Sequence, residues 1–209
     1  MHSIGVYCAS STGDAPAFVS LAKVLGKTLA EQNIRLVYGG GSVGLMGIIA
    51  DAALAAGGTV LGVIPESLRQ REVHHEGLTE LVVVDTMHER KAIMVAESDG
   101  FIALPGGFGT LDELFETLTW AQLGYHDKAV GLLNPEGYFD ALLKFLGSAV
   151  EHKLVKKQHL DMLLVDQDID RLLMRMAQYE PPNLTKWHSD LHSDLHSDRH
   201  SDRHSDSEQ

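Results

Sequence analysis

The sequence predicts an α/β protein in which helices cover both faces of a doubly wound, mainly parallel sheet. Short apolar runs alternate with segments of helical spacing almost from the first residue, and glycine-rich or small-residue loops follow several of the runs. Right-handed helical crossovers between parallel strands produce this alternation. Ligands of such sheets bind at the carboxyl ends of the strands, which is where the informative loops fall.

The expected strands are nearly continuous apolar runs, as in sheets that are covered on both faces. They occupy residues 3–8, 34–40, 59–65, 78–86, 101–105 and 128–134. The expected helices place apolar residues three and four positions apart, as Phe18, Leu21 and Leu25 do in the first one. They occupy residues 15–31, 44–58, 88–98, 110–123 and 137–151, and a last strand and helix fall within 161–178.

The length of 209 residues fits one domain, which we expect over residues 1–180. Residues 181–209 are expected to form a linker and then a disordered tail, because the repeated His-Ser-Asp units have almost no apolar residues. One interpretation of the repeat is metal binding by its regularly spaced histidines: His188, His192, His196, His200 and His204. We favour a repeat without a required function, because Ser and Asp form poor helices.

The charge and the cysteine count exclude several classes of protein. The formal net charge is −12, which argues against general nucleic-acid binding, since that depends on Lys and Arg. The single cysteine, Cys8, excludes an internal disulfide framework and fits a reducing compartment. No apolar run is long enough to span a membrane and the N-terminus lacks a basic signal region, so we expect a cytoplasmic protein without membrane partners.

Residues 101–116, FIALPGGFGTLDELFE, carry the most functional information. An apolar strand runs into a glycine turn, and a helix is predicted from Thr110. Backbone N–H groups in such a turn and the dipole of the helix attract an anion. Glu113 and Glu116 follow within two helical turns; a carboxylate there either stabilises the helix dipole or, beside a bound phosphate, has a raised pKa that suits proton transfer. The stretch predicts a phosphate site with an acid/base group beside it.

A second glycine turn, GGGSVG at 39–44, fits the dinucleotide fingerprint, and Glu66 ends the next strand. The turn follows the second strand, however, and the chain holds another glycine turn of equal quality. Two alternatives therefore remain: a mononucleotide lies across both turns, or one turn binds the ligand and the other serves packing. The loop at 8–13, on its own, is best explained as an ordinary cap of the helix that follows.

A third cluster lies on one face of the predicted helix 88–98 and its start, where Met87, Arg90, Lys91 and Met94 share a side at helical spacing. The structural interpretation is a solvated charged edge beside core methionines. The functional interpretation is that Arg90 contacts an anion or a developing charge while Met94 packs on a flat base. The spacing does not separate the two.

Taken together, these motifs resemble the LOG family, the cytokinin riboside 5′-monophosphate phosphoribohydrolases. Residues 105–113 match the signature PGGxGTxxE in full, and residues 87–91 match its MHxRK motif. The GGGSVGLMG turn and the VYCASS segment are also similar, with Ala9 in place of the family's usual Gly. The resemblance covers roughly residues 3–178 and implies a Rossmann-like α/β fold, usually as a homodimer.

The resemblance implies hydrolysis of the N-glycosidic bond of a nucleoside 5′-monophosphate, which releases the free base and ribose 5-phosphate. In plant-type members the preferred base is an N6-substituted adenine, and AMP is a poorer substrate. The catalytic arginine and glutamate of the family fall on Arg90 and Glu113. With the glycine turns, the expected substrate-binding residues are Ser10, Gly40, Gly41, Glu72, Lys91, Met94, Gly106, Gly107, Phe108, Gly109, Thr110, Leu111, Asp112, Glu116 and Thr119. Neither a metal nor a cofactor is expected.

Three other functions compete with this one. Proteins with this signature have often carried the label lysine decarboxylase, but that reaction needs pyridoxal phosphate on a Schiff-base lysine, and no residue marks one. Molybdenum-cofactor carriers look similar around the glycine turn and bind their ligand without turnover; a carrier need not keep Arg90 and Glu113 together. A dinucleotide-dependent oxidoreductase is disfavoured by the second glycine turn and by the lack of a substrate domain.

Overall fold

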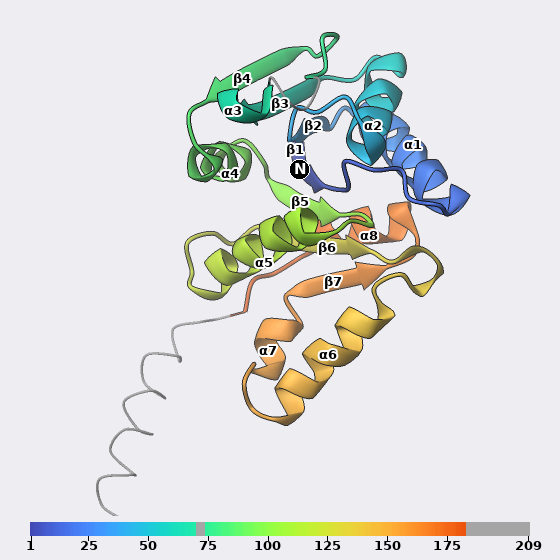
Figure 1. The fold of residues 1–209 in the computed structure, drawn as a ribbon. Helices are drawn as coiled ribbons and strands as arrows, with labels where there is room; N and C mark the ends of the chain where they lie inside the picture. Colours follow the sequence, from blue (N-terminus) through green and yellow to red (C-terminus); the bar gives the residue numbers. More distant parts are fainter. Residues whose placement is uncertain (70–73, 183–209) are drawn as a thin grey trace, which may run out of the picture.

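The computed structural model describes residues 1–69 and 74–182, which form a layered α/β fold (Figure 1). Seven strands make one sheet in the order β4-β3-β2-β1-β5-β6-β7, and each adjacent pair is parallel. The strands are β1 Ser3–Tyr7, β2 Arg35–Tyr38, β3 Val60–Pro65, β4 Glu80–Val84, β5 Gly100–Ala103, β6 Ala129–Leu133 and β7 Leu163–Asp166. The predicted doubly wound, parallel sheet is confirmed.

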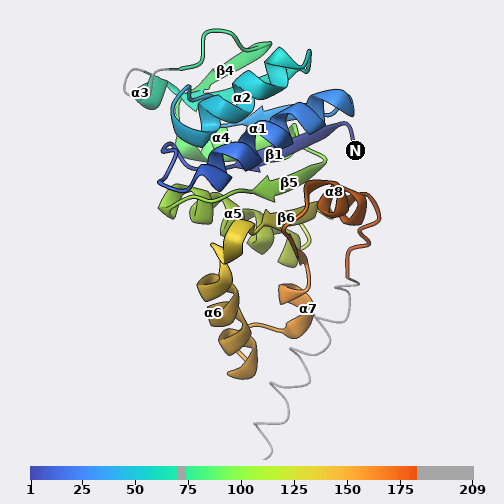
Figure 2. The same ribbon diagram turned by 90° about the vertical axis from the view of Figure 1, so that its right-hand side faces the viewer.

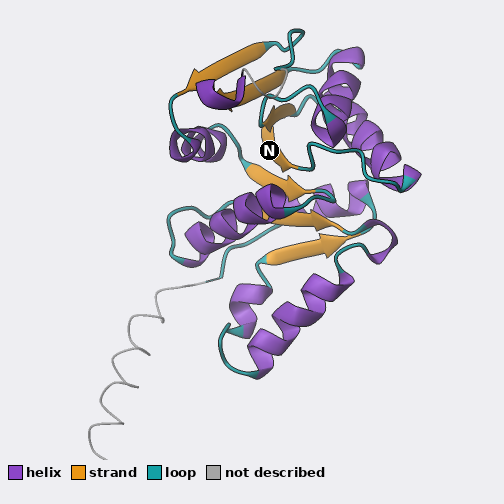
Figure 3. Ribbon diagram, in the orientation of Figure 1, coloured by secondary structure: helices purple, strands orange, loops and turns teal. Residues whose placement is uncertain are grey.

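Helices cover both faces of this sheet (Figures 2 and 3). They are α1 Pro16–Glu31, α2 Gly44–Ala55, α3 Glu66–Arg69, α4 Met87–Ala96, α5 Phe108–Gln122, α6 Asp140–Glu151, α7 Lys157–Leu160 and α8 Ile169–Ala177, with a 3-10 turn at Pro135–Gly137. Side chains of α1, α2 and α8 belong to one hydrophobic cluster, and side chains of α4, α5 and α6 belong to another. Two clusters on opposite faces explain why the strands are apolar at successive positions.

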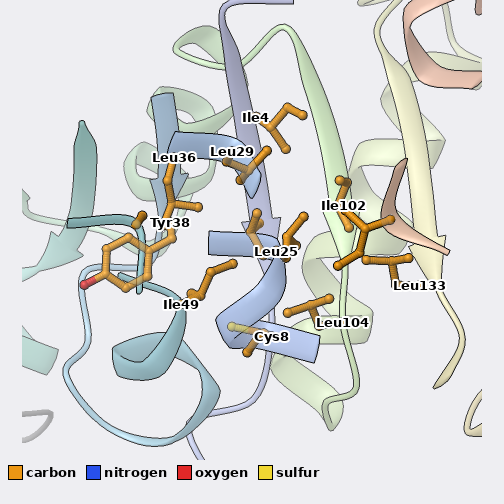
Figure 4. Close-up of a cluster of buried hydrophobic side chains, with 14 of the residues drawn as sticks. Ile4, Cys8, Leu25, Leu29, Leu36, Tyr38, Ile49, Ile102, Leu104 and Leu133 are labelled. Carbon is orange, nitrogen blue, oxygen red and sulfur yellow. The ribbon is translucent and has the colours of Figure 1, made fainter. Parts of the chain in front are cut away.

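The first cluster is shown in Figure 4, where Leu25 and Leu29 of α1 pack against side chains of the central strands. Neighbouring residues of one strand alternate between the clusters: Leu36 belongs to the first and Val37 to the second. Each is fully buried. The alternation follows from the pleat of the strand, which points successive side chains to opposite faces.

The structure departs from the predicted elements at several places. Helix α5 begins at Phe108, two residues before the predicted start at Thr110. The polar stretch after β3 contains the short helix α3, and the predicted helix 137–151 starts only at Asp140 because a 3-10 turn precedes it. The short helix α7 has no counterpart among the predicted elements. Glu72 and the His-Ser-Asp repeat lie outside the described residues.

The order of the strands fixes where a ligand can bind. The chain leaves β1 toward β2 and later returns to β5 on the other side of β1, so the winding direction reverses between these two strands. Such a reversal opens a crevice at the carboxyl ends of the strands, where ligands bind in this fold class. The loops that follow β1 and β5 meet there, and the backbone N–H of Ala9 donates to the carbonyl of Pro105 at 3.2 Å.

Candidate active site

A cavity of about 340 Å³ lies at this crevice. Its walls come from four segments: the loop after β1, the start of α2, helix α4 and the first turns of α5. The lining residues are Cys8, Ala9, Ser10, Ser11, Met46, Arg90, Gly107, Phe108, Gly109, Thr110 and Glu113. A cavity of this size suits a small ligand such as a mononucleotide.

The glycine turn before α5 forms one wall of the cavity. Gly107 is the N-cap of the helix and has no side chain to bond the N–H groups of the first turn. A Cβ atom at Gly107 or Gly109 would meet nothing within 4 Å, so there is open space beside both residues. Gly106 is different, because a Cβ there would lie 2.0 Å from Oγ1 of Thr110. The turn therefore presents a helix N-terminus to an open space, as anion sites require.

Arg90 is held rigidly, and its side chain is only 7% exposed. Its Nε donates to the carbonyl of Val63 at 3.1 Å and its Nη2 to the carbonyl of Gly39 at 3.3 Å. These carbonyls belong to β3 and to the turn after β2, so the guanidinium is fixed to two adjacent strands of the sheet. Its Nη1 lies 3.8 Å from the sulfur of Met87. A buried guanidinium held in this way offers a fixed positive charge to the cavity.

The carboxylate of Glu113 faces this guanidinium, with Oε1 3.8 Å from Nη2 of Arg90. The Glu113 side chain is 11% exposed. Burial raises the pKa of Glu113 to about 7, although the positive charge of Arg90 acts in the opposite direction. A carboxylate with a pKa near neutrality can accept a proton at physiological pH, as a general base must.

The predicted residues Lys91, Asp112 and Glu116 form a separate cluster beside the cavity. Nζ of Lys91 lies 2.9 Å from Glu116 and 3.2 Å from Asp112, which ties α4 to α5. Burial works against the charged form of Lys91, but its hydrogen bonds to Glu116 and Asp112 outweigh burial and raise its pKa. None of the three lines the cavity. Their observed contacts support the wall that carries Arg90 and Glu113.

The observed contacts of the second glycine turn are packing contacts, which favours the alternative that one turn binds the ligand and the other serves packing. Gly40 and Gly41 are predicted to bind substrate, but both are buried and neither lines the cavity. Gly40 has φ +76° and packs against Ile64 and Leu81. Gly44 approaches the backbone of Ser10 so closely that a Cβ would lie 2.2 Å from it. These contacts support the walls of the cavity.

Four other predicted residues do not line the cavity, and the first is Gly106, which lies against Thr110. Met94 is fully buried in the second hydrophobic cluster, which corrects the expectation that it packs on a base. Leu111 packs against the same cluster, and its N–H donates to the carbonyl of Gly107. Thr119 lies further along α5, where its hydroxyl donates to the carbonyl of Phe115. By contrast, Ser10 and the predicted residues of the turn from Gly107 to Thr110 line the cavity.

Four lining residues are absent from the predicted set: Cys8, Ala9, Ser11 and Met46. The first three belong to the loop after β1. A loop at the carboxyl end of a central strand can be recognised in the sequence, and such loops commonly line ligand sites in this fold class. Met46 has no local signal, because it comes to the cavity only through the packing of α2 against that loop. The N–H groups of Leu45 and Met46 both donate to the carbonyl of Ala9, which fixes this arrangement.

Comparisons with known proteins show the family to which this chain belongs. Residues 46–176 match a family model described as "Possible lysine decarboxylase". The chain is 47% identical over 178 residues to the cytokinin riboside 5′-monophosphate phosphoribohydrolase LOG7 of Arabidopsis thaliana, a match that covers 85% of this chain and 82% of the relative. It is equally identical, over 85% of this chain and 71% of the relative, to the probable enzyme LOGL6 of Oryza sativa subsp. japonica.

Two solved structures show the same fold at lower identity. The molybdenum cofactor binding protein of Rippkaea orientalis is 22% identical with a TM-score of 0.62, over 84% of this chain and 95% of that chain. The molybdenum cofactor carrier protein of Chlamydomonas reinhardtii is 23% identical with a TM-score of 0.63, over 84% and 96% of the two chains. The extent and identity of the sequence matches place this chain in the LOG family of cytokinin riboside 5′-monophosphate phosphoribohydrolases.

Proposed function

We propose that this protein hydrolyses the N-glycosidic bond of an adenosine 5′-monophosphate, with or without an N6 substituent, to the free base and ribose 5-phosphate. The observation that carries the proposal is the pair Arg90 and Glu113, which face each other across 3.8 Å in one cavity beside the N-terminus of α5. The relatives that are 47% identical to this chain are phosphoribohydrolases by name. A carrier would have no need of a buried carboxylate with a pKa near 7.

The turn from Gly107 to Thr110 would hold the 5′-phosphate. The helix N-terminus supplies N–H groups, and the space beside Gly107 and Gly109 is open. A phosphate bound there fixes one end of the nucleotide, and its binding energy positions C1′ of the ribose near the catalytic pair. We expect AMP to react much faster than adenosine, which lacks the phosphate.

Glu113 would accept a proton from the water that attacks C1′. As the bond from C1′ to the base nitrogen breaks, positive charge develops on the ribose, and the same carboxylate stabilises it. The water oxygen bonds to C1′, the bonding electrons leave with the base, and the base takes up the proton that Glu113 accepted from the water. The pKa of about 7 allows Glu113 to take and return a proton near neutral pH.

Arg90 would orient the substrate and limit the pKa of Glu113. Its guanidinium lies in the cavity wall and is held by two backbone carbonyls, so it does not need to move during the reaction. A fixed charge acts on the transition state without the energy of reorganisation that a mobile group requires.

The family description "Possible lysine decarboxylase" is not supported by this site. Lys91 is the lysine nearest in sequence to the catalytic pair, and its ammonium is bonded to Glu116 and Asp112, which raise its pKa. A Schiff base forms on a neutral amine, so an active lysine has a lowered pKa. Among the described residues, no lysine lines the cavity.

The test is to incubate the protein with AMP and with isopentenyladenosine monophosphate and to measure free base and ribose 5-phosphate. We expect release of both products, roughly 100-fold or more slowly in Glu113→Gln, and similar nucleotide binding in that variant. Glu97→Gln is the matched control, because Glu97 pairs with Arg35 at the opposite end of the strands. Bound nucleotide without any release from either substrate would contradict the proposal and favour a nucleotide-binding protein.

A further inference from the structure

A buried chain of hydrogen bonds joins the central strand β1 to the helix that carries Glu113. Tyr7, the last residue of β1, is 3% exposed, and its hydroxyl lies 2.8 Å from Oγ1 of Thr117. Thr117 is 2% exposed, and its hydroxyl donates to the backbone carbonyl of Glu113 at 2.8 Å. A threonine hydroxyl has one proton, so the Tyr7 hydroxyl must be the donor to Thr117. Burial raises the pKa of Tyr7, which keeps that proton in place.

The sheet fixes the position of the Tyr7 hydroxyl. The ring of Tyr7 stacks on Phe101 of β5, with centroids 5.8 Å apart and planes 8° from parallel. Strands β1 and β5 are direct neighbours, and Tyr7 pairs with Ala103 in their register. The phenol ring of Tyr7 therefore has little freedom to rotate or shift. Its hydroxyl holds Thr117 at a fixed distance from the sheet.

Each group of the catalytic pair has its own anchor to the sheet. Arg90 is bonded to the carbonyl of Val63 within β3 and to that of Gly39 directly after β2. The backbone of Glu113 is bonded, through Thr117, to the end of β1. The 3.8 Å between Arg90 and Glu113 is longer than a normal hydrogen bond, so their own attraction does not set the spacing. The two anchors set it.

We propose that Tyr7 and Thr117 are positioning residues that fix α5 against the sheet and so hold the Glu113 carboxylate at the spacing the reaction needs. This inference rests on the proposed hydrolysis. Neither side chain lines the cavity, so neither is expected to contact the substrate. Loss of the chain of bonds lets α5 shift along its axis, and the carboxylate moves with it. Displacements of this kind reduce the rate of a positioned reaction strongly.

The test compares isosteric variants that remove one hydroxyl each. We expect Tyr7→Phe and Thr117→Val to lower kcat for AMP about tenfold while KM changes less than about twofold, because substrate contacts stay intact. Thr117→Ser restores the hydroxyl and is expected to recover most of the rate. The double variant should lose no more than either single variant, because the two residues act through one chain of bonds.

Ser98→Ala is the matched control for a bond lost without effect on the site. Its hydroxyl is also buried and also donates to a carbonyl four residues earlier, that of Met94 at 2.7 Å, but it lies beyond the far end of α4. We expect lower stability and unchanged kcat. Normal kcat in folded Tyr7→Phe and Thr117→Val would overturn the inference and leave the proposed function standing. No release by the wild-type protein would overturn both. If Tyr7→Phe does not fold, equal rates in Thr117→Val and Thr117→Ser overturn the inference.

Discussion

Two effects act in opposite directions on the pKa of Glu113, namely its burial and the positive charge of Arg90. The side chain of Glu113 is only 11% exposed, yet the nearest positive group that faces it, Arg90, lies 3.8 Å away and is shared with two carbonyls. Burial therefore dominates and raises the pKa to about 7 from the usual 4.5. A carboxylate that is buried in this way reduces the stability of the folded state when it is ionised.

This predicts that Glu113→Gln stabilises the protein at alkaline pH. Between pH 4.5 and 7 the folded state binds more protons than the unfolded state, so the free energy of unfolding of the wild type falls as the pH rises through this window. The neutral amide of the variant carries no charge and avoids this loss. We expect the variant to be more stable than the wild type by roughly 1–3 kcal/mol at about pH 8, and by much less at about pH 4.5.

Urea unfolding at the two pH values measures this difference. Glu97→Gln is the control, because Glu97 is 45% exposed and ion-paired with Arg35 on the surface. An advantage of Glu113→Gln that is equal at the acidic and the alkaline pH would show that packing, and not ionisation, causes it.

At the scale of elements, the turn after β2 holds the side chain of Arg90 in place. The carbonyl of Gly39 accepts from Nη2 of Arg90, and a Cβ at this position would lie 1.8 Å from the same nitrogen. Only glycine lets the guanidinium approach the backbone so closely. The glycine-rich sequence at 39–44 resembles a ligand-binding fingerprint, and its observed contacts are with side chains and with the loop after β1.

We therefore expect Gly39→Ala to displace the guanidinium without unfolding the protein, because the far end of a long side chain can move. The predicted effect is a fall in kcat/KM for AMP of roughly 10- to 100-fold, with a small change in the unfolding midpoint. Gly147→Ala is the matched control, since a Cβ at this position in α6 meets nothing within 4 Å. Full activity of Gly39→Ala would show that the bond between Arg90 and Gly39 is dispensable.

At the scale of the whole molecule, the sequence predicts the sheet because each strand is a run of apolar residues between helices of clear periodicity. It also predicts the glycine turn before α5, since PGGFGT is a local signal whose function depends on adjacent residues. It cannot place Met94 or Met46, because a methionine at helical spacing packs equally well in a core or against a ligand. The hydrogen bond of Tyr7 cannot be predicted from the sequence, because its partner Thr117 is 110 residues away in the chain.

Several expectations from the sequence remain predictions, among them a homodimer, a cytoplasmic location, the domain boundaries and the roles of the site residues. Within the described part of the chain, no helix is both long and apolar enough to cross a membrane.

The positions of the cavity-lining residues predict whether the C-terminal repeat takes part in the reaction. Among the described residues, those that line the cavity all lie between Cys8 and Glu113.

Removal of residues 188–209 is therefore expected to leave kcat and KM for AMP unchanged within about twofold, because the site is built from residues far upstream in the chain. The same truncation tests whether the histidines of the repeat bind metal. Retention of the full chain on immobilised nickel, lost on truncation, would support metal binding by the repeat. A full-length variant with the five repeat histidines replaced by Ser separates loss of the ligands from loss of the segment. A truncated protein with a strongly reduced kcat would show that the repeat contributes to the reaction.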